Sequence, residues 1–436
     1  MVLRRRRHIA AVVAFVATLC ISVLSMNAAS AAQPTGSTAV RVTLPATAPA
    51  TKPLVLAAKN AVSGDCAAIR ADELRAAARG VHQQALCSTY AKSATLPPSA
   101  ALSANAVTPA VYWCTKDGAD IWVITRHEEC ITGVVDTVEA FLNGNVVGIA
   151  DFTISQNIML SATSGIFTED DTIQFTAGVG VLDVPTTVTF DAACTSSSCA
   201  TLLGSGFAAI APAESVHFHD AYEDTPSGQD PTQTEYTMEV APPPTYPPAE
   251  PVSWGSAATI RCDNQLANLP TGCVLPQYTP ALHLSAAVEG AGAVNVAVGE
   301  KYVAGTPGAS TSTPLTRLID PALQAQYGAA MCGGKTFMPI LEITDDSCDE
   351  YPFKSSQQSG GAFGLTGPAC AQAIPYQQGG AWYVDFIGNY NPATQYQCLI
   401  GHVPLAQNKL VGSHLAAFYS LNRVLNGDAY TIYVTN

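Results

Sequence analysis

The sequence predicts a secreted, multidomain protein in which a β-rich, antiparallel sandwich-like domain precedes a second domain. Three observations predict this order: an export signal at the start, β-type runs between residues 113 and 240, and a proline-rich segment at 241–253. The proline-rich segment is expected to be extended and to hold the two domains apart. The expected boundaries are 1–32, 33–112, 113–240, 241–253 and 254–436.

Residues 1–32 have the three parts of a secretory signal peptide. Arg4 to Arg7 form a basic start, Ile9 to Leu24 is mostly apolar, and Ala29-Ser30-Ala31 provides the small residues of a cleavage site. The apolar stretch is too short and wrongly flanked for a membrane anchor. We therefore expect export, and a mature chain that works outside the cell with no membrane partner.

Cysteine spacing agrees with an oxidising compartment. Cys20 leaves with the signal peptide. A zinc site is disfavoured among the remaining cysteines, because no pair of them has the two-residue spacing of a zinc knuckle. Spacing alone does not fix which cysteines bond, but local disulfides are favoured. The expected pairs are Cys66–Cys87, Cys114–Cys130, Cys194–Cys199, Cys262–Cys273, Cys332–Cys348 and Cys370–Cys398.

Acidic charge is concentrated upstream. Residues 32–250 contain 9 Lys and Arg against 23 Asp and Glu, whereas residues 251–436 contain 7 against 11. A chain this acidic lacks the broad cationic face of tight, sequence-reading DNA-binding proteins. The nearly neutral downstream part leaves room for a local basic patch and for brief contact with nucleic acid.

Residues 33–112 are rich in Ala, Thr, Pro and Ser, a composition typical of flexible linkers. Within them, Cys66 to Tyr90 has the apolar spacing of an amphipathic helix. A pro-segment or spacer is the expected role.

Residues 113–240 are expected to form an antiparallel sandwich, because short β-branched and aromatic runs alternate with Gly, Asn and Asp. Asn143-Gly144-Asn145 is a hairpin-turn signal. His217-Phe218-His219-Asp220 would put two histidines on one face of a strand, a conceivable metal site. An exposed strand face is favoured, because the acidic segment Glu169-Asp170-Asp171 is read as a distant turn and no other ligand is near.

The run Cys348-Asp349-Glu350-Tyr351-Pro352-Phe353 is the segment of the last domain that most suggests chemistry. Adjacent carboxylates can hold a divalent metal or take a proton from water. Adjacent side chains on a strand point to opposite faces, so only one carboxylate would face a substrate if the segment is extended. In an arbitrary protein, such a pair beside a proline is more often a solvated turn.

Other runs in the same region, taken together with this one, resemble a known family. They are Ile260-Arg261-Cys262-Asp263-Asn264, Gly272-Cys273-Val274, Pro314-Leu315-Thr316-Arg317, and a tail with Val403-Pro404, Asn408, Gly412, Phe418-Tyr419, Asn422-Arg423-Val424-Leu425 and Gly427-Asp428. With the Asp-Glu-aromatic-Pro segment, they resemble the NucA/NucB deoxyribonuclease domain of secreted bacterial proteins, over roughly 180 residues, one domain's length. The upstream β-rich segment is similar to the N-terminal extension of actinobacterial members.

The resemblance implies an α+β nuclease domain whose active site resembles that of ββα-metal nucleases. It implies a metal-dependent, largely sequence-nonspecific DNA endonuclease, with catalytic roles at Asp349, Glu350 and Asn408. We favour Asp349 as the base that deprotonates water. Glu350 and Asn408 are the expected ligands of Mg²⁺ or Mn²⁺, which prefer oxygen donors. Asn408 is also a candidate cap for the helix that follows it.

Basic residues near these positions are candidates for phosphate contacts. Lys354 and Lys409 lie close in sequence to the proposed chemistry, and Arg423 or Arg317 is a further candidate. The alternative, that they are ordinary surface side chains, explains the lysines nearly as well.

Two positions depart from the family pattern. Gln407 stands where many members have an acidic residue, and no histidine lies between His283 and His402, where members commonly carry one. The competing hypothesis is therefore a catalytically impaired member whose acidic, β-rich half binds a cell-surface or protein partner. No Gly-x-Ser-x-Gly or His-Glu-x-x-His motif supports another class of hydrolase.

Overall fold

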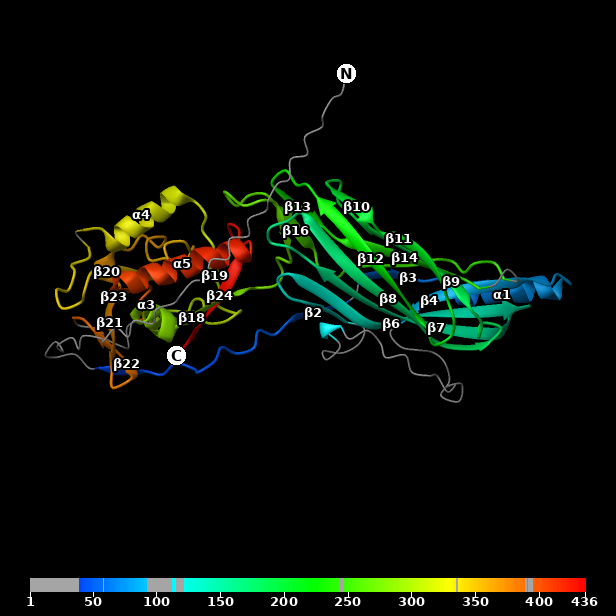
Figure 1. Cartoon of the computed structure of the whole chain (residues 1–436), viewed down its shortest axis with the longest axis horizontal. Coiled ribbons are helices and arrows are strands. Elements are labelled where there is room, and N and C mark those ends of the chain that lie inside the picture. Colours follow the sequence, from blue (N-terminus) through cyan, green and yellow to red (C-terminus); the bar gives the residue numbers. More distant parts are fainter. Residues whose placement is uncertain are drawn as a thin grey trace, which may run out of the picture.

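Two units follow each other along an elongated molecule (Figure 1). The structure is a computed structural model that describes residues 39–57, 59–91, 112–114, 121–242, 246–334, 336–388, 390 and 395–436. The two-sheet unit contains most described residues from 54 to 275, and the C-terminal unit contains residues 281–436 together with strand β1 (Val40–Val42). The predicted signal peptide, residues 1–32, lies outside the described residues.

The larger sheet of the two-sheet unit has eight strands, all antiparallel to their neighbours. Their order is β10-β12-β8-β7-β6-β5-β2, and β4 also pairs with β6. The strands are β2 (Leu54–Ala57), β4 (Gln84–Ala91), β5 (Ile121–Ile124), β6 (Glu128–Leu142), β7 (Asn145–Met159), β8 (Ile166–Gly180), β10 (Cys199–Leu203) and β12 (Ser215–Asp224).

A second sheet faces it, with the order β11-β9-β14-β15-β3, and a three-stranded sheet, β13-β16-β17, extends the unit. The proline-rich segment at 241–253 connects β14 to β15, which are hydrogen-bonded neighbours, so it does not hold two domains apart as expected. The strands are β3 (Lys59–Val62), β9 (Thr186–Cys194), β11 (Ser205–Ile210), β13 (Gln229–Thr232), β14 (Thr234–Ala241), β15 (Val252–Gly255), β16 (Ile260–Asp263) and β17 (Gly272–Val274).

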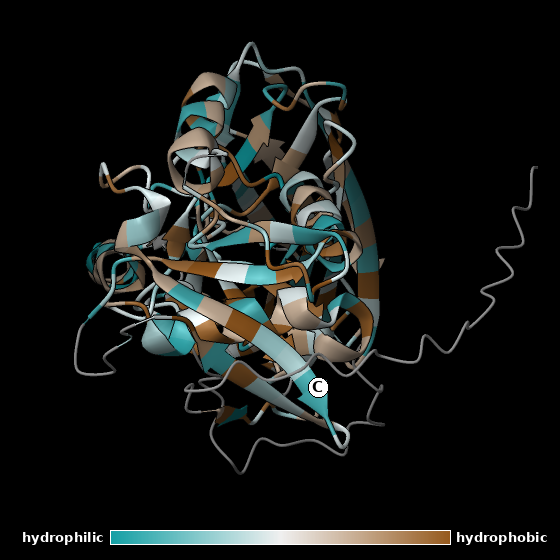
Figure 2. Ribbon diagram, turned by 90° about the vertical axis from the view of Figure 1, so that its left-hand side faces the viewer, coloured by the Kyte–Doolittle hydropathy of each residue, from teal (hydrophilic) through white to brown (hydrophobic). Residues whose placement is uncertain are grey.

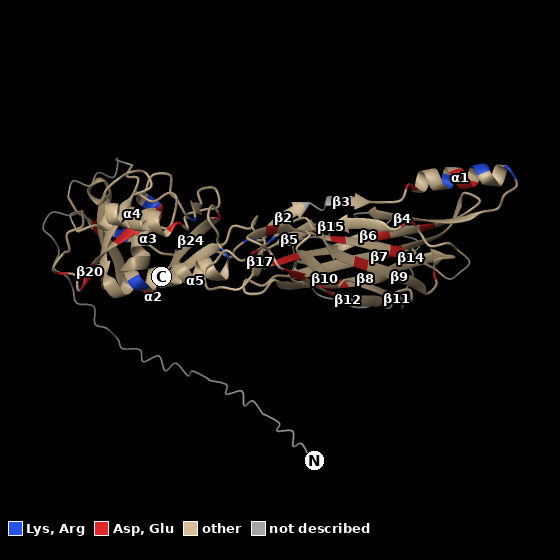
Figure 3. Ribbon diagram, turned by 90° about the horizontal axis from the view of Figure 1, so that it is seen from above, with Lys and Arg blue, Asp and Glu red and all other residues tan. Residues whose placement is uncertain are grey.

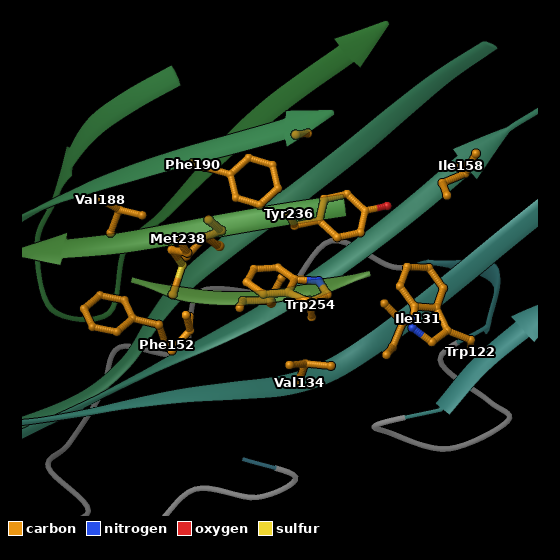
Figure 4. Packing of buried hydrophobic residues seen from close by; sticks show 14 of the residues in the cluster. Trp122, Ile131, Val134, Phe152, Ile158, Val188, Phe190, Tyr236, Met238 and Trp254 are labelled. Carbon is orange, nitrogen blue, oxygen red and sulfur yellow. The ribbon is translucent and has the colours of Figure 1, made fainter. Parts of the chain in front are cut away.

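Large aromatic side chains fill the space between the two sheets (Figure 4). Trp122, Phe152, Phe190, Tyr236 and Trp254 are all at most 3% exposed. The alternation of buried and exposed residues along β9 is the pattern expected for a strand with one face in a core. Burial of each large apolar side chain stabilises the unit by about 1.5–3 kcal/mol.

Local predictions in this unit have mixed outcomes. The turn Asn143-Gly144 is confirmed: both residues have positive φ, 52° and 77°, as a two-residue hairpin turn between β6 and β7 requires. The helix expected over Cys66–Tyr90 is shorter, because α1 (Cys66–Ala78) ends before Gly80 and β4 follows. The acidic segment Glu169-Asp170-Asp171 is not a turn, because it lies inside β8.

The C-terminal unit contains a five-stranded sheet, β1-β22-β21-β23-β20, and a three-stranded sheet, β18-β24-β19. Its helices carry hydrophobic and hydrophilic segments in turn (Figure 2), and they differ in burial, because α3 is buried along most of its length whereas α4 buries only Met331. The elements are β18 (Ala281–Ser285), α2 (Ala286–Glu289), α3 (Ala291–Tyr302), β19 (Leu315–Thr316), α4 (Pro321–Cys332), β20 (Asp346–Tyr351), a 3₁₀ turn (Gly367–Ala369), β21 (Ala371–Gln378), β22 (Ala381–Phe386), β23 (Leu399–Pro404), α5 (Leu405–Leu421) and β24 (Ala429–Thr435).

The expected fold class, a sandwich-like domain followed by an α+β domain resembling ββα-metal nucleases, is wrong. The described chain is mostly β-sheet, arranged in several sheets that are largely antiparallel. A ββα unit needs two consecutive paired strands before a helix. Here β21 and β22 form the consecutive pair, but β23 follows them, and β23 pairs with β20 and β21 before α5 begins. Pairing between distant segments therefore overrides the local order of elements.

The six expected disulfides are present with the expected pairing. Five of them close loops of 11 to 28 residues, and Cys194–Cys199 closes a shorter one. Disulfides of this number are typical of proteins that fold in an oxidising compartment. Within the described part of the chain, no helix is both long and apolar enough to span a bilayer.

Several carboxyl groups lie inside the two-sheet unit, where acidic positions are spread along its strands (Figure 3). Glu169 accepts hydrogen bonds from the hydroxyls of Tyr222 and Tyr236, at 3.0 Å and 2.6 Å. Ser88 Oγ lies 2.6 Å and 2.8 Å from the two carboxyl oxygens of Asp136. A hydroxyl has one proton to donate, so the second contact fits a protonated Asp136. Burial raises the pKa of Glu169 above its usual range and that of Asp136 to about 7.

We expect the chain to be more stable near pH 5 than near pH 8. A carboxyl with a pKa of about 7 when folded, against about 3.9 when unfolded, binds more protons in the folded chain. The free energy of unfolding therefore falls as the pH rises from about 4 to about 7. Asp136→Asn imitates the protonated acid and should reduce the difference in melting temperature between pH 5 and pH 8 by several degrees.

Thermal unfolding of the full chain at the two pH values measures this effect. Asp183→Asn, at an exposed position of the same unit, is the matched control and should keep the wild-type pH dependence. An equal pH dependence in Asp136→Asn and wild type would show that Asp136 is not a buried, protonated acid.

Candidate functional site

Strand β20 carries both predicted catalytic carboxylates. It is the edge strand of the five-stranded sheet and pairs with β23. Because β20 is extended, Asp349 and Glu350 point to opposite faces of the sheet. The disulfide Cys332–Cys348 ties the Glu350 face to helix α4, whereas Asn295 of helix α3 contacts the Asp349 face. Only one of the two carboxylates can therefore face a given substrate directly.

Asp349 is enclosed beneath helix α3 and is only 4% exposed. Asn295 Nδ2 donates to Asp349 Oδ2 at 3.2 Å and to the backbone oxygen of Asp349 at 3.1 Å. Burial raises the pKa of Asp349 to about 7, the hydrogen bond from Asn295 opposes this rise, and the charge of Glu350 adds to it. Such enclosure fits a role in positioning β20 better than the expected role as the base that activates water.

Glu350 lies on the other face and is partly accessible. Burial raises the pKa of Glu350 to about 7, and the ammonium group and backbone N–H of Lys354 oppose this rise. Its Oε2 atom is buried and has no hydrogen-bond partner among the described residues. A carboxyl with this pKa is partly ionised at neutral pH, which is the condition that favours general-base catalysis.

Gly328 of helix α4 leaves room for the Glu350 and Lys354 side chains. A Cβ atom at this position would lie 3.1 Å from Lys354 Cδ, 3.6 Å from Lys354 Nζ and 3.9 Å from Glu350 Oε1. The ends of the two side chains therefore both lie beside one residue that has no side chain of its own, although they do not form an ion pair with each other. A larger residue there would crowd both groups.

Asn408, the third predicted catalytic residue, lies on the Asp349 side of β20. Its Nδ2 atom donates to the backbone oxygen of Cys348 at 2.8 Å and to Ser347 Oγ at 3.1 Å. Helix α5 begins at Leu405, so Asn408 lies within its first turns and is not its N-cap. These two bonds hold the start of α5 against β20.

The residues expected to hold Mg²⁺ or Mn²⁺ do not fit one coordination shell. Glu350 and Asn408 lie on opposite faces of β20, so their oxygens cannot converge on one ion. Among the residues that the structure describes, no three His, Cys, Asp or Glu side chains form a cluster suited to a metal.

Gln407 and His402 both have structural roles. Gln407 Oε1 accepts a hydrogen bond from the backbone N–H of Ala291 at 2.6 Å, which satisfies the start of helix α3. His402 lies on the Glu350 side of the sheet, but its Nδ1 atom is 2.7 Å from Asp346 Oδ2 and its ring stacks on Phe337. At 5% exposure, His402 is a packed core residue.

The predicted phosphate contacts differ in accessibility. Lys354 and Lys409 are exposed, as a phosphate contact requires. Arg423 is fully buried and bonded to the Asp263 carboxylate, so it is not available to a phosphate. This corrects the expectation that Arg423 contacts DNA. Arg317, the alternative, lies 3.4 Å from the centre of an aromatic ring and is also largely enclosed.

Comparison with known proteins adds no relative. No family model, no curated protein and no solved structure matches this chain. The resemblance to the NucA/NucB domain therefore stays a prediction from sequence runs, and any assignment of function depends on the geometry around β20.

Arg423→Ala should destabilise the chain strongly, because it removes the closer ion-pair partner of the buried Asp263 carboxylate and leaves only Arg261, at 3.8 Å. Removing one partner of a buried ion pair typically costs about 3–5 kcal/mol. Chemical denaturation of the full chain measures the loss. Arg79→Ala, at an exposed position after α1, is the control and should change stability little. Similar unfolding midpoints for the two variants would contradict the structural role of Arg423.

Proposed function

We propose that the C-terminal unit is a secreted phosphodiester hydrolase that acts on DNA, with Glu350 as general base and Lys354 as a phosphate contact. The observation that carries the proposal is the position of both side chains beside Gly328, close enough for the charge of Lys354 to lower the pKa of Glu350. The runs that resemble the NucA/NucB domain supply the substrate class. The acidic composition of the rest of the chain fits weak, largely sequence-nonspecific contact with DNA.

In the proposed reaction, the Glu350 carboxylate accepts a proton from a water molecule. The resulting hydroxide forms a bond to phosphorus while the bond from phosphorus to the leaving sugar oxygen breaks, and solvent protonates that oxygen. The ammonium group of Lys354 reduces the repulsion between the anionic diester and the hydroxide. Asp349 acts as a positioning residue, because its bonds to Asn295 hold β20 against helix α3.

The expected Mg²⁺ or Mn²⁺ takes part in no step of the proposed reaction, because Glu350 and Asn408 do not share a coordination shell. A cation requirement is measured directly by adding EDTA, Mg²⁺ or Mn²⁺ to the nuclease assay.

Glu350→Gln should reduce nicking of plasmid DNA by the full chain about 100-fold or more, because an amide cannot take the proton from water. Since the pKa of Glu350 is about 7, the wild-type rate should rise as the pH increases through 7.

Lys354→Ala should weaken DNA binding and flatten its salt dependence. Glu342→Gln, at an exposed acidic position before β20, is the matched control and should nick at the wild-type rate.

Equal nicking by wild type and Glu350→Gln would contradict the role of Glu350. If the wild type leaves plasmid intact with and without added divalent metal, the hydrolase proposal is wrong. That result would favour the alternative, an extracellular binding protein. The groove on the two-sheet unit described below is the specific observation that supports this second function.

Gly328→Leu should abolish nicking without destabilising the chain, because the leucine side chain would fill the space that the ends of Glu350 and Lys354 border. Leucine also favours helix more than glycine does, by up to about 1 kcal/mol. Nicking and thermal unfolding are measured together. Gly412→Leu, at an open position of helix α5, is the control and should keep its activity. Full activity in Gly328→Leu would place the reaction elsewhere.

A further inference from the structure

A groove of about 480 Å³ lies on the outer face of the eight-stranded sheet. The short segment Tyr112–Cys114 forms one wall, and the disulfide Cys114–Cys130 fastens this segment to β6. Strands β7, β8 and β12 form the floor. The groove belongs to the two-sheet unit and shares no residue with the site around Glu350.

Two aromatic side chains in the groove are held in place by hydrogen bonds. Trp113 Nε1 donates to Asn157 Oδ1 at 2.8 Å. Tyr112 Oη lies 2.7 Å from Thr172 Oγ1, which lies 2.9 Å from His217 Nδ1. Both rings are half-buried, and part of the Trp113 ring remains exposed to a ligand. Rings that are fixed before binding lose little conformational entropy when a ligand packs on them.

Polar groups beside these rings have donors and acceptors that are not bonded to any residue that the structure describes. The bond from Trp113 leaves the NH₂ group of Asn157, and the bond from Thr172 leaves Nε2 of His217. Asp170 lies directly opposite His219 on the neighbouring strand, and its Oδ1 atom is 2.7 Å from His219 Nδ1. Sequence analysis does not predict this pairing, because it places the acidic segment in a distant turn.

A metal is not the ligand that these groups favour. The Nδ1 atoms of His217 and His219 are already bonded to Thr172 and Asp170. No cluster of three metal-binding side chains occurs in the portion of the chain that the structure describes. The favoured alternative, an exposed strand face, is confirmed, because His217 and His219 are both exposed.

We propose that this groove binds a short, neutral oligosaccharide. A sugar ring presents C–H groups that pack on aromatic faces, and hydroxyls that both donate and accept hydrogen bonds. Tyr112 and Trp113 supply the faces, and Asn157, Asp170 and His217 supply partners for the hydroxyls. The acidic charge of residues 32–250, 23 Asp and Glu against 9 Lys and Arg, disfavours sulfated or carboxylated sugars.

The test is calorimetric titration of the full chain, in EDTA, with neutral hexasaccharides of glucose, xylose, mannose or N-acetylglucosamine, and with a heparin hexasaccharide. At least one neutral sugar should bind, and heparin should not. Trp113→Ala and His217→Ala should each weaken binding about tenfold or more, the scale of one lost contact of about 1.4 kcal/mol. Phe207→Ala removes an aromatic ring that is 80% exposed on β11, and it should bind like wild type.

Each outcome decides the proposal. Binding of a neutral sugar that both groove variants weaken supports it, provided that their thermal unfolding matches wild type. No binding by any neutral sugar at millimolar concentration overturns it, as does wild-type affinity in both groove variants. Preferential binding of heparin overturns the neutral-sugar assignment. Plasmid nicking by Trp113→Ala should equal that of wild type, so failure of this proposal and of the hydrolase proposal are distinguishable.

Discussion

A buried group of three arginines and two aspartates joins the two units, and the relative placement of both candidate sites depends on it. Arg423, just after α5, pairs with Asp263 of β16, while Arg261 and Arg126 of the two-sheet unit bind Asp428. Burial lowers the pKa of Arg126 to about 10, which still leaves it charged at neutral pH. Buried charges are tolerated only when they are paired and hydrogen-bonded. Backbone oxygens offset the excess of cations, including those of Ala162, Pro270, Leu275 and Tyr278.

This joint gives a structural reason for two of the sequence runs that resemble a nuclease domain. The runs at 260–264 and 422–428 contain Arg261, Asp263, Arg423 and Asp428, whose side chains are the joint itself. These four side chains hold the two units together, so the substrate class in the hydrolase proposal depends on the other runs. Strand β1 adds a second connection, because it leaves the C-terminal sheet and the chain continues directly into the two-sheet unit. Residues 39–91 are therefore part of both units, which a spacer would not be.

Local chemistry made several features predictable. Strand alternation placed Asp349 and Glu350 on opposite faces, close cysteine spacing indicated the disulfides, and Asn143-Gly144 marked its hairpin. The features that escaped prediction all depend on segments far apart in the sequence. An arginine near the end of an amphipathic helix is normally exposed. Arg423 is buried because Asp263, 160 residues earlier, lies against it. The space at Gly328 and the use of Gln407 to satisfy α3 likewise have no local sequence signal.

Charge separates the two proposed sites in a way that suits different ligands. The acidic two-sheet unit would repel a polyanion, so the DNA of the hydrolase proposal would approach at the C-terminal unit, where Lys354 and Lys409 are exposed. A neutral sugar carries no net charge, so the acidic unit would not repel it from the proposed site near Trp113. If both proposals hold, binding to a neutral surface would fix the hydrolase in space without competing for DNA. The buried arginines and aspartates connect the two units directly. The geometry of this joint, and not the length of a tether, would therefore set the direction in which Glu350 faces.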